Sequence, residues 1–445
     1  MPVHFSGIRV GCQGRKFGMD ANDNGFLILD KVRVPLDRML MRHAKLLEDG
    51  TYVKPKHDKL IYGGMVFVRS MICTALARDL AKAATIAARY SCVRRQGEMR
   101  KGAGEVEVLS YQTQQWRVLP EMAAAFAYYF AGQSVEAFYH SAMAQLHLGQ
   151  THVLAELHAL SSGLKAVLTY GVSRGVEMCR LACGGHGYSE ASGIPDIYTF
   201  AVAGCTYEGD NMVLLLQTAR FLVRAAKSVR AEEAISAPIA KFLEKRDEFP
   251  NSKLDGNLKF EDLLQCFEHA ARRKAAECVD LLDAELGKGT ATEIAWNNCG
   301  VELTKASKAF VRVFLVRNFH ENVARIKNVA VKKVVHQLFL LYTLREFTNQ
   351  AADMIVDNFV TPEQLRLVRA KSYALLAELR PNAVALADCW DFTDRELKSV
   401  LGRKDGHVYE NLLKWAQHSE LNQKEVPDAY HKYLGPLMKE ARSKL

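Results

Sequence analysis

Apolar residues spaced three and four positions apart dominate the chain and predict that it is mostly helical. One such run, over residues 62–96, predicts a single long helix. Two more runs follow over 108–148, with an interruption or kink expected at Pro120, and over 154–182. Together with a helix that begins near Asn211, these runs are expected to form an antiparallel four-helix bundle.

A second set of helical runs follows a polar segment. Residues 247–259 gather Pro, Asn, Asp and Gly, so we expect a linker over 231–259. Beyond it, the same spacing predicts helices over 260–286, 292–326, 329–356 and 362–379, with shorter ones near 394–400 and 407–418. Thr361 and Pro362 are typical of a helix start. This second bundle carries no recognisable catalytic constellation.

The first 50 residues have a different pattern. Four glycines punctuate the start, and residues 26–34 read as a strand that ends before Pro35. A lone hairpin is not stable in water, so this segment is expected to be the remnant of a larger β domain. The predicted fold is mainly α: a β-barrel remnant (1–50), a first helical bundle (55–230), the linker (231–259) and a second helical bundle (260–445).

Composition narrows the classes of function only slightly. The net charge of +9 favours acidic ligands such as a CoA tail, but a solvated basic surface is the better explanation of it. No dense basic run with interleaved aromatic residues occurs, which disfavours nucleic-acid binding, and no apolar run approaches membrane-spanning length. The ten cysteines are scattered, so we expect reduced thiols rather than a disulfide framework.

Two glycine-rich turns hold the candidate chemistry, and the second contains a carboxylate suited to be a general base. They are CGGHGY over 183–188 and TYEGDN over 206–211. Glycine exposes backbone N–H groups that can hold an anion. Glu208 lies just before a helix and could simply complement the helix dipole, but Asp210 is better placed to cap that helix. A catalytic role for Glu208 is therefore the favoured interpretation.

Two other kinds of site are disfavoured around these turns. Cys179, Cys183, His186 and Cys205 could suggest a metal, but zinc motifs bring close-spaced ligand pairs twice, and the second pair is absent; we expect no metal. A dinucleotide fingerprint is also excluded, because no strand precedes Gly184. His158 is interpreted as a packed core histidine.

The stretch CGGHGYSEASGIPDIY, followed by TYEGDN and LLQTARFL, resembles the signature of peroxisomal acyl-CoA oxidases, which are flavoenzymes related to the acyl-CoA dehydrogenases. The resemblance implies that Glu208 is the catalytic base that removes the α proton of an acyl-CoA. Tyr207 and Gly209 are then expected to contact the substrate, with Gly209 leaving room for it.

The resemblance also implies a set of residues that contact FAD. Some of these residues are expected to face the FAD of a neighbouring subunit. The sequence RRQ at 94–96 could merely cap a helix end, but it is similar to the family motif beside the flavin nucleotide, and YQTQQ at 111–115 is similar to a stretch beside the FAD. The expected cofactor-binding residues are Arg95, Gln96, Gln112, Gly184, Gly185, His186, Gly187 and Tyr188.

The implied activity is FAD-dependent oxidation of acyl-CoA to trans-2-enoyl-CoA by a homodimer, with O2 as acceptor and hydrogen peroxide as product. A dehydrogenase that passes electrons to another flavoprotein is one alternative, although it should lack the second bundle. The other alternative is a non-catalytic isoform that acts as a dimerisation partner of a full-length oxidase. Members of the family carry an N-terminal helical domain and a β barrel, and this chain is expected to lack most of both. That expected absence favours the non-catalytic isoform.

The last three residues, Ser443, Lys444 and Leu445, form the tripeptide SKL. At a free C-terminus this tripeptide is an address that the peroxisomal import receptor reads. The expected location is therefore the peroxisome.

Overall fold

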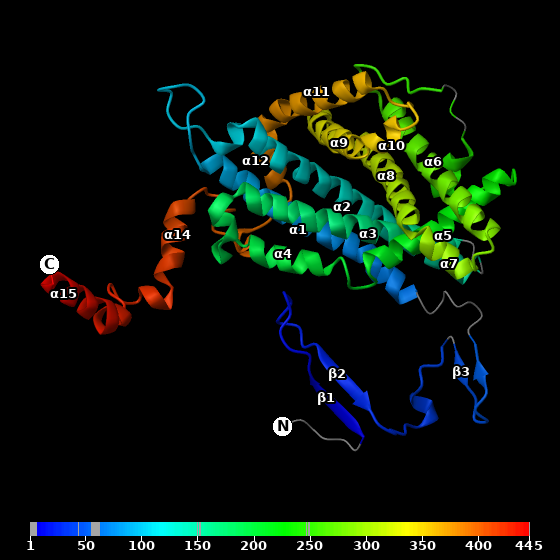
Figure 1. Cartoon of the computed structure of the whole chain (residues 1–445), viewed down its shortest axis with the longest axis horizontal. Coiled ribbons are helices and arrows are strands. Elements are labelled where there is room, and N and C mark those ends of the chain that lie inside the picture. The colour runs from blue at the N-terminus through cyan, green and yellow to red at the C-terminus, as the bar shows by residue number, and fades with distance from the viewer. Residues whose placement is uncertain are drawn as a thin grey trace.

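The computed structural model describes residues 7–42, 44–54, 63–148, 150, 153–245, 247 and 250–444. Long helices make up its first half, at bounds within a few residues of those predicted. They are α1 (Gly63–Val93), α2 (Gln112–His147), α3 (Val153–Ala182) and α5 (Asn211–Arg230), with the shorter α4 (Ile194–Ala203) before α5. Helix α1 packs against α2 and α3, and α3 packs against α5 (Figure 1).

Two local features in this half differ from what the sequence pattern predicts. Helix α2 is continuous through Pro120, so the interruption that was one of the two expected outcomes is absent. A proline inside a helix costs about 3 kcal/mol, but its neighbours Leu119 and Met122 are almost completely buried, and burial of that size offsets the cost. Gly193, Ile194 and Pro195 are typical of a loop, yet Ile194 and Pro195 form the first turn of α4. Proline is tolerated there because the first backbone N–H groups of a helix have no partner within it.

The second half is also helical, but two of the predicted long helices are divided. Its elements are α6 (Phe260–Gly287), α7 (Thr292–Asn298), α8 (Gly300–Ala324), α9 (Val329–Asn349), α10 (Ala351–Ile355), α11 (Pro362–Leu379), α12 (Ala383–Asp388), α13 (Asp394–Leu397), α14 (Val408–Gln417) and α15 (Gly435–Ser443). The run 292–326 divides into α7 and α8 at Cys299, beside a glycine, which is a poor helix former. The run 329–356 divides into α9 and α10 at Gln350.

The start of α11 lies where the sequence predicts it. The Thr361 side chain accepts a hydrogen bond from the Gln364 backbone N–H, and the Gln364 side chain accepts one from the Thr361 N–H. This reciprocal pair satisfies two backbone donors that a helix start otherwise leaves free.

The segment between the two halves is partly packed. Residues Pro238–Glu244 form a 3-10 helix, and Phe242 and Leu243 on it are buried. The Ile239 N–H donates to Glu156 of α3 at 3.0 Å. The turn-forming residues at 247–259 predict a linker over 231–259, but the apolar pair at 242–243 within it joins the core.

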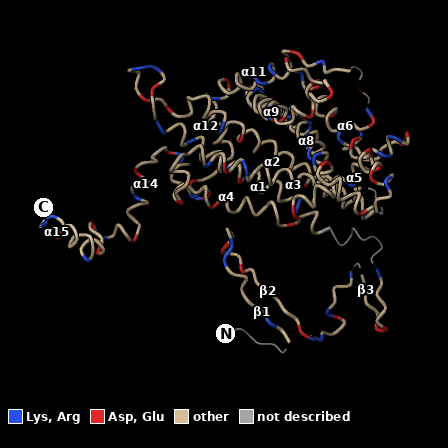
Figure 2. Tube along the Cα trace, viewed as in Figure 1, with Lys and Arg blue, Asp and Glu red and all other residues tan. Residues whose placement is uncertain are grey.

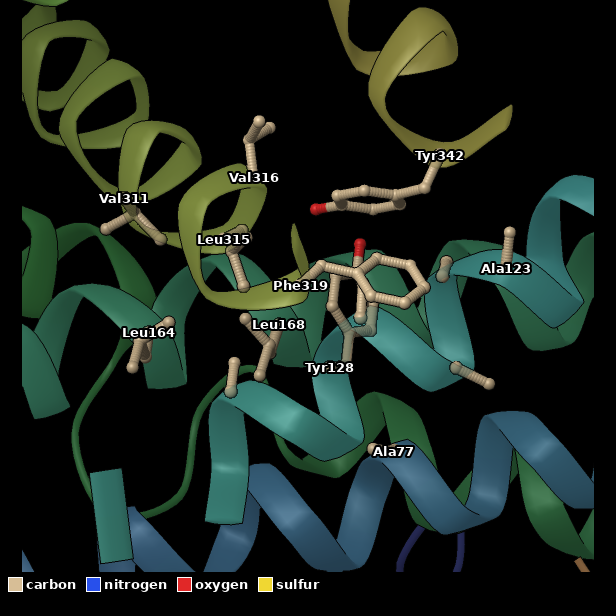
Figure 3. Close-up of a cluster of buried hydrophobic side chains, with 14 of the residues drawn as sticks. Ala77, Ala123, Tyr128, Leu164, Leu168, Val311, Leu315, Val316, Phe319 and Tyr342 are labelled. Carbon is tan, nitrogen blue, oxygen red and sulfur yellow. The ribbon is translucent and has the colours of Figure 1, made fainter. Parts of the chain in front are cut away.

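One continuous core connects both halves of the helical body. Figure 3 shows Leu164 and Leu168 of α3 facing Leu315 of α8, while Tyr128 of α2 meets Tyr342 of α9. The Tyr128 and Tyr342 rings contact edge to face, with centroids 6.1 Å apart. The two groups of helices therefore share their buried surface instead of standing as separate bodies.

The N-terminal strands lie beside the helical body (Figure 1). Strand β1 (Ile8–Cys12) pairs antiparallel with β2 (Gly25–Leu29), and β3 (Lys45–Leu46) pairs with β4 (Tyr52–Val53). Strand β2 ends earlier than the predicted 26–34, and Lys31 soon afterwards has a left-handed backbone with φ 49°. Every residue of β2 is exposed, although four of the five are apolar, so this hairpin presents an uncovered apolar surface.

Basic and acidic residues are scattered over the helices and the strand segments, and the basic ones are not gathered in one element (Figure 2). Within the described ranges, no helix combines the length and apolar character needed to cross a membrane. All ten cysteines are free thiols, as the sequence predicts.

Candidate active site

Glu208 lies in a tight turn between α4 and α5 and has an uncommon backbone conformation. The Asn211 N–H donates to the Cys205 carbonyl at 3.1 Å and closes the turn over 205–211. Within it, φ is 55° at Glu208 and 110° at Gly209. The left-handed region costs a residue with a Cβ about 1–2 kcal/mol, so the surroundings must hold Glu208 there.

Two buried cations hold the turn through consecutive carbonyl groups. Arg69 of α1 donates from Nε to the Glu208 carbonyl at 2.9 Å, and Lys165 of α3 donates from Nζ to the Gly209 carbonyl at 2.6 Å. Arg69 is 5% exposed and Lys165 is fully buried. A hydrogen bond to a charged group contributes about 1.5–3 kcal/mol. The two bonds together therefore outweigh the backbone strain at Glu208.

The charge of Arg69 is only partly compensated. Burial lowers the pKa of the Arg69 guanidinium, while the nearby Glu208 charge acts in the opposite direction. Its Nη1 atom is buried without a hydrogen-bond partner in the described part of the chain. Such an atom is a donor that a ligand bound beside the turn could satisfy.

Asp210 caps α5, as the sequence predicts. Its side chain accepts a hydrogen bond from the Met212 N–H at 2.9 Å. Glu208 is consequently not needed as a cap, and its side chain is half-buried. Its neighbour Tyr207 is also half-buried, and burial raises the pKa of the Tyr207 phenol to about 12, so the hydroxyl remains a donor at neutral pH.

A mostly apolar cavity of about 390 Å³ opens beside this turn. It is bounded by α1, α3, α5 and the end of α2, with Gly209 in its wall. The apolar lining residues are Val66, Met143, Leu154, Leu157, Val213 and Leu214, and the polar ones are Arg69, His158, Gln217 and Arg220. A pocket of this kind suits a hydrocarbon chain with a polar group beside the turn. His158, interpreted as a core residue, is half-buried in this wall.

The residues expected to contact FAD meet at the other end of α1. The Gln96 carbonyl accepts a hydrogen bond from the Tyr111 hydroxyl at 3.1 Å, which ties the loop after α1 to the start of α2, where Gln112 is exposed. Arg95 is exposed and donates to the Glu105 carbonyl at 3.2 Å. The structure therefore brings Arg95, Gln96 and Gln112 to one end of the bundle.

The glycine turn lies at this same end. Gly184–Tyr188 forms a 3-10 helix directly after α3, and the His186 ring meets Tyr90 of α1 edge to face, with centroids 6.1 Å apart. Tyr188 is 80% exposed. Gln114 of α2 donates to the Ala182 carbonyl at 2.7 Å and so joins α2 to the end of α3 just before this turn.

The three glycines of this turn serve different purposes. Gly184 has φ 61°, which favours glycine, and a Cβ on Gly187 would lie 2.1 Å from the Arg180 carbonyl oxygen. A Cβ on Gly185 would instead point into open space. Folding thus explains Gly184 and Gly187, whereas it leaves Gly185 unexplained.

The two sets of candidate residues are far apart. Arg69 near the start of α1 and Val93 at its end are separated by about 36 Å, at the helical rise of about 1.5 Å per residue. The carboxylate of Glu208 and the glycine turn therefore cannot meet around the reactive part of one small ligand within one chain.

Sequence reasoning missed Arg69, Lys165 and Asn211. Each is a polar residue whose role depends on contacts between distant segments: 139 positions separate Arg69 from Glu208. For Arg69 and Lys165, the available signal was a lone cation within an apolar helical stretch, as in FVRSM and GLKAVL.

Comparison with known proteins gives consistent results along the chain. The family model described as "Acyl-CoA oxidase, C-alpha1 domain" matches residues 62–223, and the model described as "Acyl-CoA oxidase" matches residues 259–439. Among similar proteins, the acyl-coenzyme A oxidase acox-1.1 of Caenorhabditis elegans is 44% identical over 98% of this chain and 65% of its own length. The peroxisomal acyl-coenzyme A oxidase 1 of Phascolarctos cinereus is 40% identical over 97% of this chain and 67% of its own length.

Solved structures agree in fold. The acyl-CoA oxidase-2 of Caenorhabditis elegans, bound with FAD, ascaroside-CoA and ATP, matches 98% of this chain and 65% of its own with a TM-score of 0.93 at 42% identity. Acyl-CoA oxidase 1 of Arabidopsis thaliana matches 98% of this chain and 67% of its own with a TM-score of 0.90 at 36% identity. The chain thus spans about two thirds of the length of these relatives. It belongs to the acyl-CoA oxidase family.

Proposed function

We propose that this chain carries out FAD-dependent oxidation of an acyl-CoA to trans-2-enoyl-CoA, with O2 reduced to hydrogen peroxide. The observation that carries the proposal is the half-buried carboxylate of Glu208, on a strained turn anchored by two buried cations and beside an apolar cavity. Membership of the acyl-CoA oxidase family supports the same reaction class.

Glu208 is the general base in this proposal. The α proton of a thioester is weakly acidic, so its removal needs a carboxylate fixed within hydrogen-bond distance of the α carbon. A positioned base of this kind contributes roughly 10²–10⁴-fold to the rate. Backbone N–H groups of the turn would hold the charge that develops on the thioester oxygen, since the conformation around Glu208 is already fixed before the substrate binds.

The cavity beside the turn is proposed to receive the acyl chain. Its apolar walls suit a hydrocarbon, and Gly209 leaves the backbone accessible at its mouth. Tyr207 lies beside the base with a protonated hydroxyl and is proposed to contact the thioester end. Water excluded from these walls would strengthen the electrostatic interactions around Glu208.

The surface that contains Arg95, Gln96, Gln112 and Gly184–Tyr188 fits an extended anionic cofactor. It offers an exposed guanidinium, two exposed amides and a glycine turn whose Gly185 leaves open space. FAD, when bound, supplies the acceptor for the hydride from the β carbon and passes the electrons to O2. FAD is present in solved structures of similar oxidases from Caenorhabditis elegans.

The separation of the two residue sets supports a homodimer. Since about 36 Å of α1 lies between them, each chain would give its base to one cofactor and its glycine turn to another. The exposed apolar hairpin of β1 and β2 also favours a covering partner. This surface supports the second candidate function, in which the chain serves as a dimerisation partner of another oxidase.

We also propose a peroxisomal location. Relatives from Cavia porcellus and Rattus norvegicus, each 41% identical, are named peroxisomal acyl-coenzyme A oxidase 1. Ser443 and Lys444 of the predicted import signal are exposed, and Leu445 lies outside the described residues.

The purified chain tests these proposals directly. After incubation with FAD and gel filtration, it should retain flavin absorbance and release hydrogen peroxide in equal amount to the enoyl-CoA formed. Sedimentation should give a dimer. A dimer that has neither flavin absorbance nor peroxide release, and that gains both when mixed with an active relative, would favour the second candidate function.

A further inference from the structure

Lys165 is a charged residue buried where an apolar one would cost less. It lies in the middle of α3, fully buried, and its neighbours Leu164 and Ala166 belong to the core. Taking an ammonium out of water is costly unless hydrogen bonds compensate it, and an apolar side chain of similar size is often as stable or more stable. The position therefore calls for an explanation other than packing.

Among the residues that the structure describes, the hydrogen-bond partners of the Lys165 ammonium group lie in the turn that carries Glu208. Its Nζ donates to the Gly209 carbonyl at 2.6 Å and to Asn211 Oδ1 at 3.0 Å. It also lies 5.9 Å from the centre of the Tyr207 ring, within the range of a cation–π interaction. The ammonium thus contacts the residues on both sides of Glu208.

Asn211 is itself fixed for this role. Its Nδ2 donates to Thr169 Oγ1 at 2.9 Å, which leaves Oδ1 to accept from Lys165. Asn211 and Thr169 are buried, and Thr169 lies one helical turn beyond Lys165 on α3. Lys165 and Thr169 on one face of α3 therefore hold the turn through Asn211, and this pair is called the cradle below.

Holding the Gly209 carbonyl fixes the peptide plane between Gly209 and Asp210, because the peptide group is planar. Arg69 holds the preceding carbonyl, that of Glu208, in the same way. The two planes meet at the Cα of Gly209, whose φ is 110°. The plane that Arg69 holds is also the one that follows Glu208, whose left-handed φ of 55° is a conformation that a residue with a side chain leaves when its surroundings loosen. Holding this plane restricts the ψ angle of Glu208 and so limits the directions that its Cα–Cβ bond can take.

We propose that Lys165 is a positioning residue, which aims the Glu208 carboxylate at the substrate by holding the Gly209 carbonyl and Asn211. This inference rests on the proposed role of Glu208 as the base. It assigns Lys165 no contact with the substrate and no proton transfer.

The ionisation of Lys165 gives the proposal a pH dependence. Burial lowers the pKa of its ammonium to about 8; Arg69 acts in the same direction, and Cys205, Asp210 and Cys73 oppose it. Tyr207, the other titratable group that faces it, stays neutral in this range. The cationic anchor is therefore complete at pH 7 and is lost as the pH rises through about 8, which adds an alkaline limb to the kcat profile.

Lys165→Met tests the proposal, because it keeps the length of the side chain and removes the charge and the hydrogen bonds. We expect kcat to fall about 10²-fold, as for a small misplacement of a catalytic group, with KM unchanged and without the alkaline limb near pH 8. Amide hydrogen exchange in 205–211 should become faster. Lys274→Met is the matched control, since Lys274 is also buried but lies on α6 and pairs with Asp353; it should change neither kcat nor this exchange.

Hydrogen exchange separates failure of this inference from failure of the proposed function. Unchanged kcat and unchanged exchange at 205–211 in Lys165→Met would overturn the inference. If the wild-type chain releases no peroxide, faster exchange at this turn still supports the anchor, and unchanged exchange still overturns it. If Lys165→Met does not fold, Thr169→Val replaces it: faster exchange at the turn supports the cradle, and wild-type exchange refutes it.

Discussion

Gly187 and Gly185 are two positions apart in one turn, and the structure predicts opposite consequences of adding a methyl group to each. A Cβ on Gly187 would lie 2.1 Å from the Arg180 carbonyl oxygen and 3.0 Å from the Cys183 Cβ, whereas ordinary contact begins at 3.4 Å. Neither neighbour is the free end of a flexible side chain. The backbone after α3 must therefore move in Gly187→Ala.

The expected cost is that of overpacking a buried site, about 1–3 kcal/mol. At Gly185 the added methyl group meets nothing within 4 Å and φ is not positive, so Gly185→Ala should change the free energy of unfolding by no more than about 0.5 kcal/mol. Urea denaturation measures both: the midpoint should fall in Gly187→Ala with an unchanged slope, and it should stay in place in Gly185→Ala.

FAD affinity, in contrast to stability, is the property that Gly185→Ala should change. If the cofactor lies against the open side of the turn, Gly185→Ala weakens flavin binding in a fully stable protein, which titration followed by flavin fluorescence detects. Equal stability of the two variants would refute the steric reasoning at Gly187. Wild-type FAD affinity in Gly185→Ala would refute the placement of the cofactor against this turn.

Three further predictions concern stability and reactivity. Asp388→Ala should lower the free energy of unfolding by about 3 kcal/mol in urea denaturation, because it leaves the buried Arg89 guanidinium, 2.7 Å away, without its carboxylate. Burial alone would raise the pKa of Asp357, but the hydrogen bond from His269 holds that pKa below its ordinary value. The resulting stabilisation is present above about pH 4 and lost as the pH falls further, so acid unfolding of Asp357→Asn should depend less steeply on pH. Iodoacetamide should alkylate the exposed Cys12 before any buried thiol, as peptide mass mapping would show, and faster labelling of a buried thiol would contradict the packing.

Much of the helical architecture could be predicted from the sequence, because helix periodicity and capping are local properties. The start of α11 at Pro362 follows from the residues on either side of it. The continuity of α2 through Pro120 could not be predicted, since it depends on tertiary burial that outweighs a local preference.

The candidate site could be predicted only in part, for the same reason. The turn and the family resemblance indicate Glu208 as the candidate base, and the rules of helix capping predict the role of Asp210. Arg69 and Lys165 contact this turn from helices whose position no local pattern specifies. The distance between Glu208 and the glycine turn likewise depends on the direction in which α1 runs.

Turnover by Glu208→Gln in the FAD-loaded protein tests the central claim most directly. Glutamine keeps the shape of the side chain and the anchored turn but cannot accept the α proton. Peroxide release with a saturating acyl-CoA should fall by roughly 10²–10⁴-fold, while the flavin content and the urea midpoint stay at their wild-type values. Peroxide release near the wild-type rate in a variant with full flavin content would contradict the assignment of Glu208 as the base.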